Sequence, residues 1–275
     1  MNGILIVDKD KNMTSFDVCH ELMKVFNTKR IGHTGTLDPI ATGVLVCTIG
    51  KYTKLNEVLT STYKEYIADM ELGRLTDTLD TEGKDLECNI RFDITEEEIR
   101  NTIMSYKKTY LQEVPIYSSV KVNGKKLYEY ARQGINVELP KKEVTIKELE
   151  ILDINNNHVR FKCLVSKGTY IRSLIRDIGV SLNTGAIMTD LRRTQQGDFD
   201  IKDAYTLEDI KNNNYKLLSI EDVFDVNIIE CDDNLYKSIS SGVRQEYNHE
   251  YILYKYNNKD IALYKEGKMF IYLND

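Results

Sequence analysis

One aspartate stands in an unusual loop, where its carboxylate could take part in catalysis. The loop holds three glycines, three threonines, one histidine and one carboxylate, in the run Arg30-Ile31-Gly32-His33-Thr34-Gly35-Thr36-Leu37-Asp38-Pro39-Ile40-Ala41-Thr42-Gly43-Val44-Leu45. Gly32 and Gly35 allow backbone angles that other residues avoid, and Pro39 disfavours a helical conformation at Asp38. The sequence therefore predicts a rigid loop that presents one carboxylate in a defined direction. The alternative is an ordinary turn in which Asp38 caps the backbone.

Three other chemistries fit the residue spacing less well. The segment from Gly43 to Gly50 suggests a phosphate-binding loop, but six residues separate the glycines and Tyr52 replaces the required Ser or Thr. A calcium loop centred on Gly83 would place Asn89 where a bidentate Glu belongs. A hydrolase would use the loop aspartate to activate water, but the sequence has no second carboxylate in a similarly rigid motif.

Composition indicates a globular protein without a membrane span. The chain has 275 residues, 41% of them hydrophobic and 29% charged, and no apolar run approaches the roughly 18 residues that a membrane helix needs. The N-terminal segment is typical of a first strand, not of a signal peptide. Five cysteines are spread without a Cys-x-x-Cys pair, which favours reduced core thiols in a cytosolic protein over a disulfide framework or a zinc site.

Charge is distributed unevenly along the chain. The net charge of −6 argues against a nucleic-acid partner, yet residues 160–193 are mainly basic and residues 198–233 mainly acidic. Local fields matter more than the total for binding a phosphate backbone. We expect the acidic stretch to face away from such a partner.

Hydrophobic periodicity predicts alternating strands and helices around the loop. The predicted strands are 1–9, 44–49, 64–72, 144–154 and 159–165, and Tyr66 shares the apolar face of the third. The first predicted helix is capped by Thr14 or Ser15 and has Phe16 on its apolar face. The other predicted helices run from Thr95 to about Lys108, from 125 to 133, from Ile171 to near Gly185, and from near Thr206 onward. Residues 112–124 are predicted to form an extended arm that turns at Asn123-Gly124, and short tyrosine-rich strands begin at about 228.

Several of these motifs together resemble the TruB-type tRNA pseudouridine synthases. The resemblance covers about residues 3–197 and rests on GHTGTLDPIATGVL around Asp38, the strand and loop 64–83, the arm 112–134, the SKGTYIRSL motif at 166–174, and 185–193. Val114 and Ser119 depart from the family pattern, where proline and alanine are usual. Both substitutions affect the arm and leave the chemistry untouched.

The resemblance implies an isomerase that converts a uridine in the T-loop of tRNA, at position 55, to pseudouridine. Asp38 matches the nucleophile, Arg172 its cationic partner, and Tyr66 the residue that stacks on the uracil. His33 matches the residue that fills the space left by the flipped base. The remaining matches are substrate-binding or pocket residues (Tyr170, Leu191, Asp80 and Lys167) and cations that grip the RNA backbone (Lys121, Lys125, Lys126 and Arg132).

The same resemblance implies an α+β fold with a mixed, mostly antiparallel central sheet, flanking helices and a small β-rich C-terminal module. We expect residues 1–227 to form the catalytic domain, including an RNA-gripping arm at about 112–142, and residues 228–275 a short, degenerate PUA-like module. No metal, nucleotide or redox cofactor is implied, and the expected partner is the tRNA T-arm, bound by a cytoplasmic monomer. The rival hypothesis is a non-catalytic tRNA-binding chaperone. Whether Asp38 would attack C1′ or C6, or a glycal forms instead, stays open at this stage.

Overall fold

The chain forms two compact units. Each unit is made of segments that are not contiguous in sequence. The computed structural model describes residues 1–60, 63–87, 91, 93–246 and 249–273. Unit 1 comprises Met1–Pro39, Val44–Ser61 and Ile201–Asp275, and unit 2 comprises Ile40–Gly43 and Thr62–Asp200. Within the described part of the chain, no helix is both long enough and apolar enough to cross a membrane.

Unit 1 is built on β1 (Gly3–Lys9), the short β2 (Ile31–His33) and β3 (Thr42–Ile49), which enters this unit at Val44. β2 pairs antiparallel with β3, and α1 (Ser15–Val25) packs against α6 (Leu207–Lys211). A 3-10 helix (Gly50–Leu55) and α2 (Asn56–Thr60) follow β3, and a second 3-10 helix (Ile201–Asp203) precedes α6. The shared core consists of residues from these elements: Leu5, Val18, Leu22, Leu45 and Ile210.

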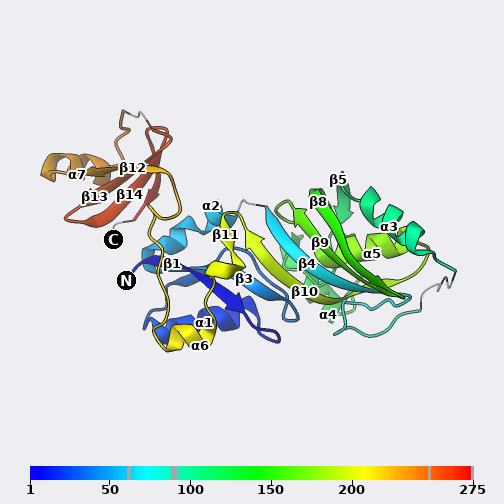
Figure 1. Cartoon of the computed structure of the whole chain (residues 1–275). Helices are drawn as coiled ribbons and strands as arrows, with labels where there is room; N and C mark the ends of the chain where they lie inside the picture. Colours follow the sequence, from blue (N-terminus) through cyan, green and yellow to red (C-terminus); the bar gives the residue numbers. More distant parts are fainter. Residues whose placement is uncertain (61–62, 88–90, 92, 247–248, 274–275) are drawn as a thin grey trace. The chain divides into compact units, whose positions relative to one another are not determined.

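The C-terminal segment of unit 1 is a four-stranded sheet with one helix (Figure 1). The elements are β12 (Val226–Glu230), α7 (Asp233–Ser240), β13 (Tyr251–Tyr256), β14 (Lys259–Lys265) and β15 (Lys268–Tyr272). Their buried residues form a core of their own: Cys231, Ile239, Ile252, Tyr254, Ala262 and Tyr264. The predicted β-rich C-terminal module is therefore confirmed. Its PUA-like character, and the boundary at residue 227, stay predictions.

Unit 2 is a large sheet with helices packed on it. Its strand order is β10 (Ala186–Gln196), β4 (Lys64–Leu72), β9 (His158–Val165), β8 (Lys141–Asn155) and β5 (Thr109–Glu113), with every pair antiparallel. Thr42 and Gly43, the first residues of β3, pair in parallel with β10, and β11 (Phe199–Asp200) adds to it antiparallel. Helix α5 (Ile171–Ser181) packs against β10 and β4, and α3 (Glu96–Ser105) packs against β8 and α5 (Figure 1). The predicted α+β class with a mixed, mostly antiparallel sheet is confirmed.

Several predicted elements are correct in type and shifted at their ends. Of the two predicted caps for the first helix, Thr14 is the N-cap residue, and the predicted capping box at Thr95 forms. Helix α3 ends at Ser105, before the predicted Lys108, because residues 109–113 pair with β8. The prediction for Phe16 is wrong, since this side chain is 67% exposed while Val18, Cys19 and Leu22 fill the core.

Strand β10 was not predicted as a strand. It has register irregularities between Met188 and Asp190 and between Arg193 and Gln195. Each bulge shifts the side-chain alternation by one residue, so the period of two that reveals a strand in sequence is lost.

A lysine lies on the buried face of β4. Lys64 is 7% exposed. Burial and, to a smaller extent, the nearby cations Arg193, Lys167 and Lys142 together lower the pKa of its ammonium group to about 8. Because an unfolded lysine titrates near 10.5, the folded state destabilises the charged form of this residue.

Replacing this lysine should stabilise the protein at neutral pH. Below pH 8 Lys64 is charged in both states and the penalty is constant. Between about pH 8 and 10.5 only the unfolded state keeps the proton, so the free energy of unfolding of the wild type should rise with pH. We expect Lys64→Met to be more stable at pH 7 by on the order of 2 kcal/mol and to lose this rise, measured by urea unfolding from pH 7 to 10. Lys107→Met, at an exposed site, is the matched control, and a Lys64→Met curve that keeps the wild-type slope would contradict the assignment.

Candidate active site

The backbone on both sides of Asp38 is held in place within unit 1. Leu37 is buried, its N–H donates to the Ser15 hydroxyl at 2.9 Å, and that hydroxyl lies 3.3 Å from the Leu37 carbonyl. The Pro39 carbonyl accepts from the Asn12 N–H at 2.8 Å. Asp38 itself is half-buried. The predicted loop is therefore present, and its backbone is hydrogen-bonded to Ser15 at the start of α1 and to Asn12 just before that helix.

The segment before Asp38 is fixed by pairing with β3. His33 lies opposite Cys47 at the end of β2 and is half-buried. The next residue, Thr34, is buried, and both its N–H and its hydroxyl lie near the Val46 carbonyl, at 3.0 and 3.4 Å. Gly35 follows with φ +133, a value that side chains disfavour. The turn toward Asp38 therefore needs glycine at this position.

The segment after Asp38 is fixed by pairing with β10 within unit 2. The chain passes from unit 1 to unit 2 between Pro39 and Ile40. Gly43 lies opposite Arg193 with φ +101, and an added Cβ would stand 2.1 Å from the Arg193 carbonyl oxygen. Only glycine permits this approach of two backbones.

A predicted catalytic residue and a predicted pocket residue lie on one buried face of the unit 2 sheet. Tyr66 on β4 is 7% exposed and lies opposite Arg193, and Leu191 on β10 is also buried and lies opposite Ala68. The Arg193 guanidinium approaches the Tyr66 hydroxyl at 3.5 Å and is fully buried. A tyrosine ring and an apolar side chain therefore lie on adjacent strands beside a guanidinium.

Arg172 lies in the first turn of α5 with its guanidinium buried. It donates to the Thr78 carbonyl at 2.9 Å and to the Tyr117 carbonyl at 3.1 Å. Asp80, also buried, approaches it at 3.9 Å and accepts from the Thr78 hydroxyl at 2.5 Å. The structure thus brings together two predicted residues, Arg172 and Asp80, and the planar fork of an arginine matches the two carbonyls.

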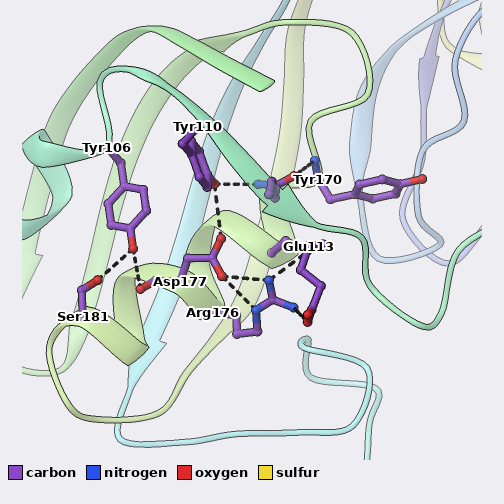
Figure 2. A network of polar contacts seen from close by, with 9 residues as sticks. Tyr106, Tyr110, Glu113, Tyr170, Arg176, Asp177 and Ser181 are labelled. Carbon is purple, nitrogen blue, oxygen red and sulfur yellow. Dashed lines mark hydrogen bonds and ion pairs between the residues drawn. The ribbon is translucent and has the colours of Figure 1, made fainter. Parts of the chain in front are cut away.

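Tyr170 precedes Arg172 as the N-cap residue of α5. It is half-buried, and its ring extends away from the polar network beneath it (Figure 2). The preceding Lys167 is exposed. Gly168 has φ +83, and an added Cβ would lie 2.0 Å from Nζ of Lys142.

Lys142 and Lys167 belong to a basic cluster, which we define as Lys64, Lys142, Lys167 and Arg193. The sequence predicted only part of this cluster. Lys167 was predicted as a site residue and the other three were not. The alternation of β4 already placed Lys64 on the same face as Tyr66, which was a usable signal. Lys142 and Arg193 gave no such signal, because their places depend on strand pairing.

The predicted arm contains a two-stranded hairpin and a helix. β6 (Lys121–Val122) pairs with β7 (Lys125–Lys126), and the turn residues Asn123 and Gly124 have φ of +51 and +81. These values fit the predicted Asn-Gly hairpin turn. Helix α4 (Leu127–Arg132) follows, later than the predicted start at residue 125 because the two lysines belong to the hairpin.

The four predicted backbone-gripping cations all lie on this hairpin and helix. Lys126 and Arg132 both approach the Tyr128 ring, at 5.4 and 5.2 Å from its centroid. Lys125 approaches the Tyr130 ring at 4.8 Å, and Lys121 is exposed. Cation–π contacts of this kind orient the long side chains and keep the charges close together.

The predicted site residues are thus divided between the units. Asp38 and His33 belong to unit 1, and all the others belong to unit 2. Among the described cysteines, Cys19, Cys47, Cys163 and Cys231 are buried, while Cys88 lies outside the described residues. No group of three or more His, Cys, Asp or Glu side chains with metal-binding geometry occurs in the described ranges.

Comparison with known proteins identifies the family. Residues 23–171 match the N-terminal domain of the TruB family pseudouridylate synthases, and residues 172–226 match the tRNA pseudouridylate synthase B C-terminal domain. A Clostridium tetani protein named tRNA pseudouridine synthase B is 41% identical over 272 residues, which is 98% of this chain and 93% of that protein. A Lactobacillus acidophilus protein of the same name is 40% identical over 286 aligned positions and covers 98% and 96% of the two chains.

Solved structures share the fold at lower identity. A chain in the crystal structure of a Cbf5-Nop10-Gar1 complex superposes with a TM-score of 0.69 at 24% identity and covers 98% of this chain and 82% of that one. A chain in an H/ACA RNP bound to a substrate RNA containing 2'-deoxyuridine gives 0.67 at 22% identity, with the same coverage. The family matches extend over most of the sequence, so this chain belongs to the TruB family of pseudouridylate synthases.

Proposed function

We propose that this protein isomerises a uridine in the T-loop of tRNA, at position 55, to pseudouridine. The family assignment supports the reaction, and relatives at about 40% identity are named tRNA pseudouridine synthase B. The observation that carries the proposal is the loop around Asp38, whose backbone is anchored by hydrogen bonds on both sides of that residue. The T-arm as the docking element and a cytoplasmic monomer as the active species belong to the same proposal.

In this proposal Asp38 meets the other catalytic groups at the flipped uridine. Four residues after Asp38, the chain is paired with β10 beside Arg193, which lies opposite Tyr66. Asp38, Tyr66 and Arg172 are assigned to one base because each matches a catalytic residue of the family. His33, which precedes the loop, would occupy the space that the base leaves in the RNA.

The reaction rearranges bonds without an external reactant. The N1–C1′ glycosidic bond breaks, the uracil rotates, and a C5–C1′ bond forms. C5 then loses a proton and N1 gains one, so atoms and electrons balance. The Asp38 carboxylate acts as the nucleophile beside C1′ and C6, and Arg172 is its cationic partner. Tyr66 stacks on the uracil, and Tyr170 and Leu191 bracket it.

The first prediction separates catalysis from binding. We expect Asp38→Asn, which keeps the size and polarity of the side chain, to bind an unmodified tRNA transcript normally and to lose pseudouridine formation by about 10⁴-fold or more. Pseudouridine would be mapped after incubation without added metal or nucleotide. Asp10→Asn, at an exposed aspartate of the same unit, should behave as wild type. Full turnover by Asp38→Asn would favour the non-catalytic chaperone and reject an aspartate nucleophile.

The second prediction concerns the fork of Arg172. Lysine keeps the charge but cannot donate to the Thr78 and Tyr117 carbonyls together, so the cation should shift by about 1 Å or more. We expect Arg172→Lys to lower the single-turnover rate on the order of 10²-fold, with tRNA affinity within a few-fold. Arg160→Lys, in an exposed ion pair with Asp69, should leave both unchanged. Equal losses of rate and affinity would assign Arg172 to RNA docking.

The third prediction concerns the arm. If Lys121, Lys125, Lys126 and Arg132 contact phosphates, log Kd plotted against log salt should have a slope of about 3. Lys121→Gln should reduce that slope by about 1 and weaken binding of all tRNAs alike. Lys107→Gln, at an exposed lysine outside the arm, is the control. A salt-independent Kd would show that phosphates do not carry docking.

A further inference from the structure

Strand β5 buries an amide and exposes a leucine. Gln112 is 1% exposed, whereas its neighbour Leu111 is 65% exposed. The hydrophobic effect alone would favour the opposite orientation of the strand. The position of Gln112 must therefore be stabilised by specific hydrogen bonds, because a buried amide without them is costly.

Those hydrogen bonds place Gln112 within a chain of polar groups, with one partner at the oxygen and one at the nitrogen of its amide. Its Oε1 accepts from the Tyr170 backbone N–H at 2.8 Å, and its Nε2 donates to the Tyr110 hydroxyl at 2.8 Å. The Tyr110 hydroxyl in turn donates to the Asp177 carboxylate at 3.4 Å (Figure 2). Only one orientation of the amide satisfies both of its contacts, so the network fixes the side chain in direction as well as in place.

The neighbouring residue ties the same strand to the same helix. The Glu113 carbonyl accepts from the Ser173 hydroxyl at 2.8 Å, and its carboxylate pairs with Arg176 at 3.1 Å (Figure 2). Arg176 also pairs with Asp177 at 2.8 Å. Residues 170, 173 and 177 lie on one side of a helix because of their spacing. The end of β5 therefore holds this side of α5 over its first two turns.

We propose that Gln112 is a positioning residue: its amide sets the backbone of Tyr170 at the start of α5 and thereby the direction of the Arg172 side chain. This inference rests on the proposed function. Gln112 begins the predicted RNA-gripping arm, and the Arg172 guanidinium contacts the Tyr117 carbonyl farther along the same arm. The start of the arm and the helix that carries Tyr170 and Arg172 are thus joined through one buried amide. RNA binding to the arm would be transmitted to these residues by that connection.

Three variants of the full-length protein test the inference. Gln112→Met keeps the approximate volume and removes both hydrogen bonds. Tyr110→Phe keeps the bond from Tyr170 to Gln112 and removes only the partner of Nε2. The matched control is Tyr106→Phe, because the Tyr106 hydroxyl also bonds to α5, at the Asp177 carbonyl (2.7 Å) and the Ser181 hydroxyl (2.8 Å), far from the start of the helix (Figure 2).

We expect the single-turnover rate of Gln112→Met to fall about 10- to 100-fold, with the Kd for tRNA within about twofold. The rate of Tyr110→Phe should fall only a few-fold, and that of Tyr106→Phe should stay at the wild-type value. Thermal unfolding would be measured for all three, so that a rate loss is compared between variants of similar stability. Hydrogen exchange supplies a readout without catalysis: the Tyr170 amide should lose protection in Gln112→Met and keep it in Tyr106→Phe.

Two results would overturn the inference. One is a wild-type rate in Gln112→Met. The other is a rate loss in Tyr106→Phe as large as that in Gln112→Met, when the two variants lose the same stability. That second result would make Gln112 a structural residue only. A wild-type protein that forms no pseudouridine in tRNA would instead reject the proposed function. The two failures are therefore distinguishable in one set of measurements.

Discussion

The close approach of two backbones at Gly43 and Arg193 is the constraint on which the rest of the candidate site depends. It requires a residue without Cβ, at a φ that side chains disfavour, and it pairs the segment after Asp38 with β10. β10 pairs on its other side with β4, which carries Tyr66. A larger residue at position 43 would push the strand away from β10 and release the loop that precedes it.

Unit 2 also buries an unusual set of polar side chains. Arg172, Arg193, Lys64 and Gln112 are each at most 7% exposed. Burial of charged and amide groups opposes folding unless partners compensate, and for Arg172 and Gln112 backbone groups are among those partners. Such residues cost stability compared with apolar side chains of the same volume. Their gathering on and around one sheet face is expected where a site must hold a charged intermediate or an anionic substrate.

The arm and helix α5 illustrate how distant segments act together. Residues 112, 113 and 117 bond to residues 170, 173 and 172, which come 55 to 60 positions later in the chain. These bonds join backbone groups and buried side chains, so they specify geometry more tightly than surface ion pairs can. Three cations of the arm, Lys125, Lys126 and Arg132, by contrast contact the nearby rings of Tyr128 and Tyr130. The arm and the start of α5 thus rest on two different kinds of interaction within one unit.

The sequence by itself determined the local features of this protein. The N-cap at Thr14, the capping box at Thr95, the Asn123-Gly124 turn and the alternation of 64–72 all follow from interactions between residues close in the chain. The motifs that resemble the family, and the site residues that the resemblance implies, also come from the sequence alone. Tertiary structure decided the rest. The bulges in β10 hide its alternation, Phe16 is exposed although its spacing is helical, and Gln112 is buried although its neighbour is apolar. In each case the outcome depends on contacts with residues far away in sequence, and the energy of those contacts outweighs local preference.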